Sequence, residues 1–241
     1  MIYSKSALRY DINSLLILIK MAKYGYIQDD AKFLQKVIGD INKLSFEGNI
    51  NAKEFLNIVF GEPISNIFDS SRYRFFLNLS YTYESIPKGL FSSFYNLQRV
   101  NIPNSVTKIE CEAFSDCPNL SFVNIPESIE GESIGKRAFK NCPKLKCIKM
   151  PYKLTKIEDE TFKGDEELSN VEMNNKLRII GKEAFANCKS IQYLKIPGSV
   201  EMICDKAFNG CQNLKVIIFE SSETKLGNDV MSPDVTIIYE D

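Results

Sequence analysis

The 241-residue sequence predicts an α/β solenoid, in which successive turns of the chain stack and share one apolar core. Three columns of apolar residues recur with a 23-residue period that is lengthened once, between Phe114 and Phe139. A fixed period with a fixed apolar pattern indicates repeats that bury their apolar faces only against their neighbours. The columns are Phe91, Phe114, Phe139, Phe162, Phe185 and Phe208; Leu97, Leu120, Leu145, Leu168, Ile191 and Leu214; and Val100, Val123, Ile148, Val171, Leu194 and Ile217.

Each repeat is expected to begin with a short strand. Residues 97–102 read L-x-x-V-x-I, the strand pattern of leucine-rich repeats, and Val100 and Ile102 point inward with the period of two that a strand requires. Proline cannot donate to a sheet ladder, and it ends four of the expected strands, at Pro103, Pro126, Pro151 and Pro197. The sequence therefore predicts a right-handed leucine-rich repeat horseshoe with a parallel β-sheet on its concave face.

The N-terminal segment, residues 1–67, lacks the 23-residue period and is expected to be helical. Residues 6–23 and 29–44 each place apolar side chains on one helical face, and residues 51–60 are a shorter third candidate. The first repeat would otherwise expose its core to water. We therefore interpret residues 1–67 as an N-terminal helical capping domain.

The predicted solenoid of about six to seven repeats spans residues 68–219. Its first turn is degenerate. Leu77 and Ile86 lie one period before Val100 and Ile109, so they occupy the same repeat positions in a turn that has lost most of the other signals.

After residue 219 the pattern loosens, and residues 220–241 are expected to form a C-terminal loop followed by a closing strand. That strand contains Ile237, Ile238 and Tyr239. The backbone edge of an exposed apolar strand is a template for pairing with another copy. The sequence thus predicts self-association into a homo-oligomer through this end of the solenoid.

Composition excludes several classes of function. The chain has no His, which removes the imidazole base and the commonest metal ligand. A formal net charge of −1 and a pI near 5.8 argue against nucleic acid as a partner. No run approaches the roughly 20 apolar residues of a membrane-spanning helix, and the apolar run at residues 15–19 is short for a signal peptide.

The cysteine pattern indicates a structural role. The chain has seven Cys and no C-x-x-C pair, so a zinc site has no support. One repeat position holds Cys117, Cys142, Cys188 and Cys211. Phe94 and Asp165 take that position in two other repeats. We interpret the column as a ladder of buried thiols; the alternative is a disulfide between neighbouring rungs, which side chains stacked in parallel about 4.8 Å apart suit poorly. Reduced thiols favour an intracellular protein.

One string of residues carries a family resemblance. The pattern I-x-x-x-A-F-x-x-C-x-x-L-x-x-V-x-I-P occupies residues 109–126 and recurs with substitutions at 134–150, 180–196 and 203–219. It resembles the BspA-like leucine-rich repeats of surface and secreted proteins of anaerobic bacteria and of large protist families. The resemblance covers about residues 85–219 and implies adhesion or protein–protein binding, with no catalytic residues or cofactors. The Asn- and Lys-rich composition is more similar to a protist-type member.

The strand register predicts which side chains face solvent on the concave sheet. After each starting Leu, positions two, three and five point outward, and they carry five basic residues against one acidic residue. Basic residues mixed with exposed aromatics are typical of a protein-binding face, here for an acidic segment of a protein partner. The alternative is solvated Lys side chains beside aromatics that stack across strands. The predicted partner-binding residues are Arg99, Phe122, Lys146, Lys149, Glu172, Tyr193, Lys195, Lys215, Val216 and Ile218.

Catalytic chemistry has little support. The paired carboxylates Asp159 and Glu160 lie in a polar turn where solvation explains them, and no Gly-rich phosphate loop occurs. No Ser can be activated by a His, since the chain has none. Cys147 is a solvent-facing candidate whose only basic neighbours are Lys146 and Lys149. The sequence predicts no catalytic, cofactor-binding or metal-binding residues, and hence no enzyme.

The leading functional interpretation is a non-enzymatic protein–protein interaction module inside the cell. One alternative is an adhesin-like protein of the cell surface, exported without a standard signal peptide. Another is an intracellular regulatory subunit that docks on an enzyme such as a protein phosphatase.

Overall fold

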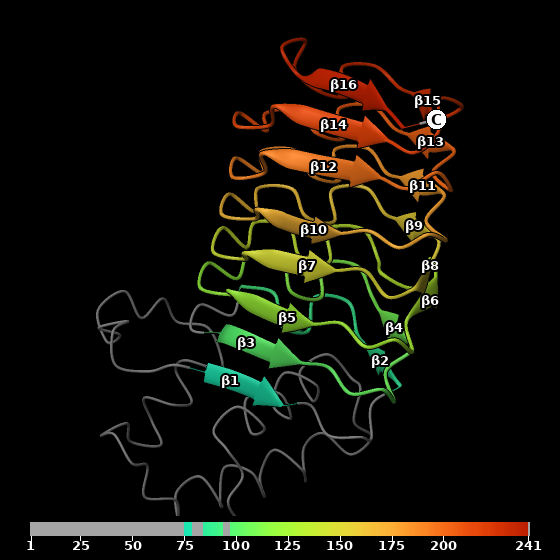
Figure 1. Cartoon of the computed structure of the whole chain (residues 1–241). Coiled ribbons are helices and arrows are strands. Elements are labelled where there is room, and N and C mark those ends of the chain that lie inside the picture. The colour runs from blue at the N-terminus through green and yellow to red at the C-terminus, as the bar shows by residue number, and fades with distance from the viewer. Residues whose placement is uncertain (1–74, 79–83, 94–96, 241) are drawn as a thin grey trace, which may run out of the picture. The chain divides into compact units, whose positions relative to one another are not determined.

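The computed structural model describes residues 75–78, 84–93 and 97–240 (Figure 1). The chain divides into two units, Met1–Tyr73 and Arg74–Asp241, and the described residues belong to the second. The predicted capping domain at residues 1–67 and the start of the first repeat lie outside the described residues.

The second unit is a parallel-strand β-solenoid, which confirms the predicted fold class. Its turns stack in sequence order from β1 to β16 (Figure 1). One side of each turn carries a longer strand, and the opposite side a shorter one. The longer strands are β1 (Phe75–Asn78), β3 (Leu97–Asn101), β5 (Phe122–Asn124), β7 (Cys147–Lys149), β10 (Asn170–Glu172), β12 (Tyr193–Ile196), β14 (Val216–Phe219) and β16 (Thr236–Tyr239).

The longer strands pair in three parallel groups, β1–β3–β5, β7–β10 and β12–β14–β16. Their register follows the repeat. Leu77 pairs with Val100, which confirms that the degenerate first turn has the predicted register. We call the surface formed by the outward side chains of β3, β5, β7, β10, β12, β14 and β16, together with Lys146 and Lys215 immediately before β7 and β14, the strand face; it corresponds to the concave sheet of the sequence prediction.

A second column of two-residue strands lies across the core from the strand face. Ile109 bridges Ile134 with the longer spacing of the lengthened repeat, whereas β6 pairs with β8 at the ordinary spacing of the other repeats. The insertion that lengthens this repeat therefore lies between β6 and Ile134. The short strands are β2 (Ser85–Ile86), β4 (Lys108–Ile109), β6 (Glu130–Gly131), β8 (Lys153–Leu154), β9 (Lys156–Ile157), β11 (Ile179–Ile180), β13 (Met202–Ile203) and β15 (Lys225–Leu226).

The third side of each turn consists of tight turns that still bond to their neighbours. The amide of Phe114 donates to the carbonyl of Ala138 at 2.8 Å, and equivalent bonds recur along the phenylalanine column. Just after each Phe the backbone turns left-handed, as at Asn141. Gly164 shares this conformation, and an added Cβ there would lie 2.5 Å from Asn141 Oδ1, so the position favours glycine.

The six phenylalanines form one file through the core, as the sequence predicts. Neighbouring ring centroids lie 5.0–5.6 Å apart with interplanar angles of 1–13°, an offset-stacked arrangement. Each ring is at most 1% exposed. Because every ring contacts a ring of the next turn, the stack links successive repeats into one core.

The cysteine column is a buried thiol ladder, as predicted. Cys117, Cys142, Cys188 and Cys211 are buried, and none of the chain's seven cysteines forms a disulfide. Each thiol of the column donates to a phenylalanine carbonyl of the preceding turn; Cys188 Sγ, for example, lies 3.2 Å from the carbonyl oxygen of Phe162. The ladder thus gives each of these buried carbonyls a donor from the following turn.

Candidate protein-binding face

The strand face carries all ten side chains that the sequence assigns to a partner site. Along β12, Leu194 and Ile196 are buried while Tyr193 and Lys195 are exposed. The same alternation runs along β3, where Arg99 is exposed beside the buried Val100. The inward and outward positions of the strands are therefore those of the predicted register, while binding by these residues stays a prediction.

Apolar side chains gather on the C-terminal part of the strand face. Tyr193 of β12 pairs with Val216 of β14, and Ile218 of β14 pairs with Ile238 of β16, across three hydrogen-bonded strands. Tyr193 is 51% exposed and Ile238 43%, while Val216 and Ile218 are half-buried. We call Tyr193, Val216, Ile218 and Ile238 the apolar strip.

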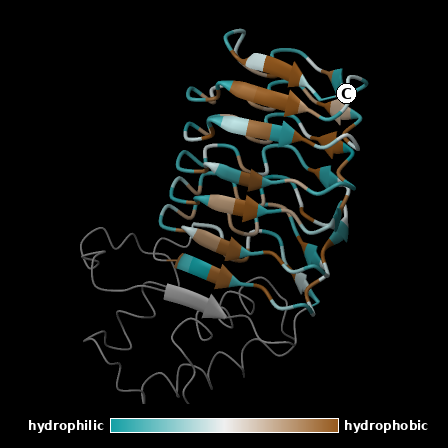
Figure 2. Cartoon of the chain, viewed as in Figure 1, coloured by the Kyte–Doolittle hydropathy of each residue, from teal (hydrophilic) through white to brown (hydrophobic). Residues whose placement is uncertain are grey.

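The sequence of β14 explains the strip. The strand reads Val-Ile-Ile-Phe and is apolar along its whole length (Figure 2). Ile217 and Phe219 fill the core, which leaves Val216 and Ile218 on the opposite side of the sheet. A strand that is apolar on both sides is typical of a sheet with both faces covered, whereas here one face is open among the described residues.

The charge of the strand face is lower than its strand residues alone suggest. Lys195 Nζ lies 2.9 Å from Glu240 Oε2 and 3.0 Å from Glu220 Oε1. These hydrogen bonds, the one to Glu240 first, raise the pKa of Lys195, and the bond from Lys195 lowers the pKa of Glu220. Both carboxylates lie just beyond a strand end, outside the repeat positions from which the sequence prediction counted charges.

Two further cations are also partly engaged. The Arg99 guanidinium lies 4.6 Å from the centroid of the Phe122 ring, a cation–π contact. Lys146 Nζ lies 3.9 Å from Glu167 Oε2. Among the described residues, Lys149 and Lys215 form no ion pair, so they are the cations of the face that remain available to an acidic partner.

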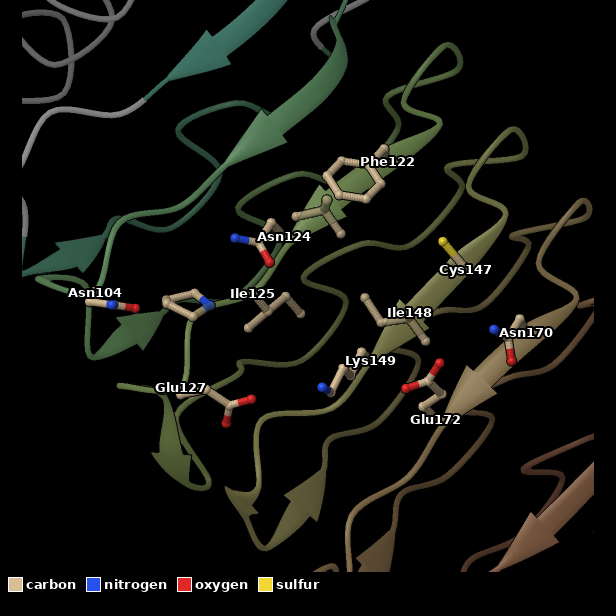
Figure 3. Close-up of a pocket in the computed structure, with 12 residues that line it drawn as sticks. Asn104, Phe122, Asn124, Ile125, Glu127, Cys147, Ile148, Lys149, Asn170 and Glu172 are labelled. Carbon is tan, nitrogen blue, oxygen red and sulfur yellow. The ribbon is translucent and has the colours of Figure 1, made fainter.

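A groove lined by both polar and apolar side chains interrupts the N-terminal part of the strand face. β5 and β7 do not pair, and a cavity of about 370 Å³ lies there (Figure 3). Phe122 of β5 lies on one side, and Cys147 and Lys149 of β7 and Glu172 of β10 lie on the other. We call this the β5–β7 groove. Sequence reasoning missed the loop residues that complete its wall, which are Asn104, Pro126 and Glu127.

The three residues of the self-association prediction do not share one surface. β16 pairs with β14, and among the described residues its other edge is open. Ile237 and Tyr239 follow Ile217 and Phe219 in register, and the Tyr239 ring stacks on Phe219 at 5.5 Å. They therefore lie at the exposed end of the core, at 40% and 49% exposure, whereas Ile238 belongs to the strand face.

The paired carboxylates Asp159 and Glu160 serve the fold. Lys136 Nζ lies 2.7 Å from Asp159 Oδ2. Glu160 accepts from Arg137 at 2.9 Å and from Lys140 at 2.7 Å, and these bonds lower the pKa of Glu160 to about 2. Both carboxylates thus join neighbouring turns of the solenoid through ion pairs.

Two further features of the described residues bear on function. They contain no group of three or more His, Cys, Asp or Glu side chains placed to hold a metal ion. Within the same residues, no helix has the length and apolar character needed to cross a bilayer.

Comparison with known proteins identifies the repeat. A sequence model described as "BspA type Leucine rich repeat region" matches residues 34–132 and 132–237 in six copies. No curated protein matches the chain.

Solved structures with a similar fold come from bacteria. A leucine-rich repeat protein of T. pallidum is 26% identical with a TM-score of 0.60, over 65% of this chain and 75% of its own. One from Eubacterium ventriosum is 23% identical with the same TM-score, over 66% of this chain and 43% of its own. A pneumococcal vaccine antigen, PcpA, is 16% identical with a TM-score of 0.53, over 70% of this chain and 61% of its own. These likenesses concern the fold of the repeat.

Proposed function

The chain belongs to the BspA-type leucine-rich repeat family, and from that premise we propose that it is a non-enzymatic module that binds a protein partner on its strand face. The observation that carries the proposal is the apolar strip. Val216 and Ile218 occupy outward positions of a continuous sheet, where they are only half-buried and lie outside the core. Contiguous exposed apolar side chains rimmed by polar ones are typical of protein interfaces.

The surroundings of the strip favour a partner with an acidic segment. Lys215 precedes β14 and forms no ion pair among the described residues, and Lys149 lies in the β5–β7 groove on the same face. Such a partner would cover the strip with apolar side chains and meet these two cations at its edge. Tyr193 is the central aromatic group of this arrangement and the expected anchor.

Affinity capture with quantitative mass spectrometry tests this proposal. Tyr193→Ser removes a ring that is 51% exposed on the apolar strip, and Tyr152→Ser removes a ring that is 55% exposed in the turn after β7, outside the strip, which makes a matched control. We expect a protein captured by the wild type and by Tyr152→Ser to be lost with Tyr193→Ser combined with Ile218→Thr. Equal capture by all three folded proteins would contradict the strand-face assignment.

We also propose that the protein acts inside the cell. The support is the set of seven cysteines without a disulfide, which an oxidising compartment would expose to disulfide formation. The alternative is the cell surface, where an adhesin-like role would fit other BspA-type repeats. Fractionation combined with protease treatment of intact cells distinguishes the two: a chain that resists the protease until lysis is intracellular, and one that is digested on intact cells is on the surface.

A second proposed interaction is self-association through the end of β16. Six large hydrophobic side chains are exposed among the described residues, and Leu226, Ile237 and Tyr239 are three of them at this end of the core. An open strand edge beside apolar side chains favours pairing with a second copy. We expect sedimentation velocity to show a concentration-dependent dimer that Ile237→Lys abolishes and Tyr152→Lys retains. A monomer at high concentration would exclude it.

A further inference from the structure

Asp165 interrupts the cysteine column with a carboxyl group that is wholly buried. It occupies the repeat position of Cys142 in the turn before and of Cys188 in the turn after, and its exposure is 0%. Burying a charged carboxylate without a cation is costly, so its protonation state decides whether this turn is stable.

The cysteines of the column show what the position requires. Each thiol donates to the carbonyl of the phenylalanine one turn earlier, at 3.1 or 3.2 Å. The four pairs are Cys117 with Phe91, Cys142 with Phe114, Cys188 with Phe162, and Cys211 with Phe185. In the same register the partner of residue 165 is the carbonyl of Phe139.

The Phe139 carbonyl lacks the two donors that an equivalent carbonyl has. The Phe185 carbonyl accepts from the amide of Cys188 at 3.1 Å and from the thiol of Cys211. At Phe139 the corresponding amide, that of Cys142, instead donates to Asp165 Oδ1 at 2.8 Å. Among the described residues no other donor reaches the Phe139 carbonyl, so it depends on the side chain at position 165.

The second carboxyl oxygen of Asp165 is equally isolated. Oδ2 is buried and has no hydrogen-bond partner among the described residues. A carboxylate can only accept, and two acceptors facing each other cannot pair. A proton on Oδ2 would turn the oxygen into the donor that the position calls for.

We propose that Asp165 is a neutral carboxylic acid whose Oδ2–H donates to the Phe139 carbonyl in place of a thiol, and that loss of this proton loosens the turn that leads into β10. Burial raises the pKa of Asp165 well above its usual range, in the same direction. The titratable groups that face it are the thiols of Cys117, Cys142 and Cys188, none of which supplies a positive charge. The adjoining Glu166 is exposed and bonds to Lys189.

The sign of the pH dependence follows from the raised pKa. An unfolded chain releases the Asp165 proton near its ordinary pKa of about 3.9, whereas the folded chain retains it to higher pH. The stability from the protonated group is therefore complete below about pH 3.9 and is lost as pH rises toward the folded pKa. In that window one extra proton is bound by the folded state, so the ratio of folded to unfolded chain falls about tenfold per pH unit from this group.

The loosened turn lies beside the strand face. Asp165 shortly precedes β10, which contributes Asn170 and Glu172 to the wall of the β5–β7 groove. A rise in pH would therefore loosen this wall of the groove first. The shape of the β5–β7 groove would therefore depend on pH through Asp165, a buried residue that does not itself line the groove.

Asp165→Asn tests the proposal, because an amide can accept from Cys142 through its oxygen and donate to Phe139 through its nitrogen without titrating. Urea unfolding under reducing conditions would be compared from about pH 5 to about pH 8 for wild type, Asp165→Asn and the exposed control Glu167→Gln. We expect the stability ratio of Asp165→Asn to wild type to rise about tenfold per pH unit up to the folded pKa, and Glu167→Gln to follow the wild type. Parallel profiles for wild type and Asp165→Asn would overturn the proposal.

A measurement on the wild type covers the case in which Asp165→Asn does not fold. Infrared spectra report the carbonyl stretch of a protonated carboxylic acid separately from that of a carboxylate. We expect a protonated-acid band in the folded wild type near neutral pH that is absent in Asp165→Cys, which restores the residue type of the column. A folded wild type without that band would contradict the proposal.

Discussion

The two halves of the strand face are built from the same repeat and offer different surfaces. On β12, β14 and β16 the strands are hydrogen-bonded in continuous register, and their outward positions form the apolar strip. Between β5 and β7 the ladder is interrupted, and polar and apolar side chains surround a cavity. The inward residues are alike in both halves, since Val123, Ile148, Leu194 and Ile217 are all buried.

Inward residues of the strands determine the fold, whereas outward residues can vary to serve binding. Inward residues repeat because each turn must match the turn beside it, and this requirement fixes the solenoid. Outward residues are free of that constraint, so their departure from polar character on β14 has no explanation in the fold itself. We therefore expect a protein partner to bind chiefly on the apolar strip, while the groove, whose wall mixes polar and apolar side chains, contributes Lys149 at the edge of the interface.

The largest effect is expected from a substitution in the aromatic core, because both halves of the strand face rest on that core. Phe162→Ala removes a ring that stacks on Phe139 at 5.6 Å and on Phe185 at 5.3 Å. Loss of a buried phenylalanine costs about 3–5 kcal/mol in the free energy of unfolding. Urea denaturation should show this loss, and a change below about 1 kcal/mol would contradict a continuous aromatic core.

The next largest effect is expected from a charge placed in the apolar strip, which should weaken binding of the partner. Ile218→Glu places a charge in the centre of the proposed interface while Ile217 keeps its place in the core. We expect the Kd for the captured partner to rise by a factor of about 30 or more, corresponding to about 2 kcal/mol.

The control for this change lies in the groove. Asn124→Asp adds the same charge to an outward position of β5. We expect it to alter the Kd by less than about threefold in calorimetry. A stronger effect from Asn124→Asp than from Ile218→Glu would move the interface to the groove.

Much of the fold could be predicted from sequence because the same pattern recurs in every repeat, so each repeat supports the interpretation of the others. The phenylalanine file, the pairing of Leu77 with Val100 and the buried thiols all follow from columns that recur at fixed spacing. The in-and-out pattern of the strands follows equally well, and it places all ten predicted residues on the strand face.

What could not be predicted depends on contacts that leave no periodic signal. The ion pairs of Lys195 join a strand to Glu220 and Glu240, which lie outside the repeat pattern. The lengthened repeat lies between β5 and β7, but a longer period does not by itself predict a break in the ladder, since β10 and β12 also do not pair although their spacing is ordinary. Asp165 is visible in the sequence as an exception in its column, but only the packing shows that its second oxygen lacks a partner.

A third prediction concerns acid stability of the ion pairs that join neighbouring turns. The bonds from Arg137 and Lys140 lower the pKa of Glu160 from 4.5 to about 2, so the stability from this group is present above about pH 4.5 and is lost as pH falls toward 2. Because Arg137 is half exposed, we expect about 1 kcal/mol. Glu160→Gln should flatten this part of the profile in thermal unfolding; an unchanged acid limb would exclude the contribution.

The smallest expected effect separates two lysines of the strand face. Lys149 forms no ion pair among the described residues, whereas Lys195 is held by two carboxylates. We expect Lys149→Gln to slow association with an acidic partner several-fold at low salt, with the effect shrinking at high salt, and Lys195→Gln to change it less. Stopped-flow association rates measure both, and a larger effect of Lys195→Gln would contradict the assignment of free charge to Lys149.

The most direct measurement is a titration of methyl-labelled protein with the captured partner, followed by NMR. Ile218 and Ile238 carry outward methyl groups on the strip, Ile217 carries inward ones from the same strand, and Ile179 lies in the second column of strands. The account predicts that the signals of Ile218 and Ile238 shift or broaden first while those of Ile179 stay in place. Perturbation of Ile179 with Ile218 and Ile238 unmoved would show that the partner binds elsewhere.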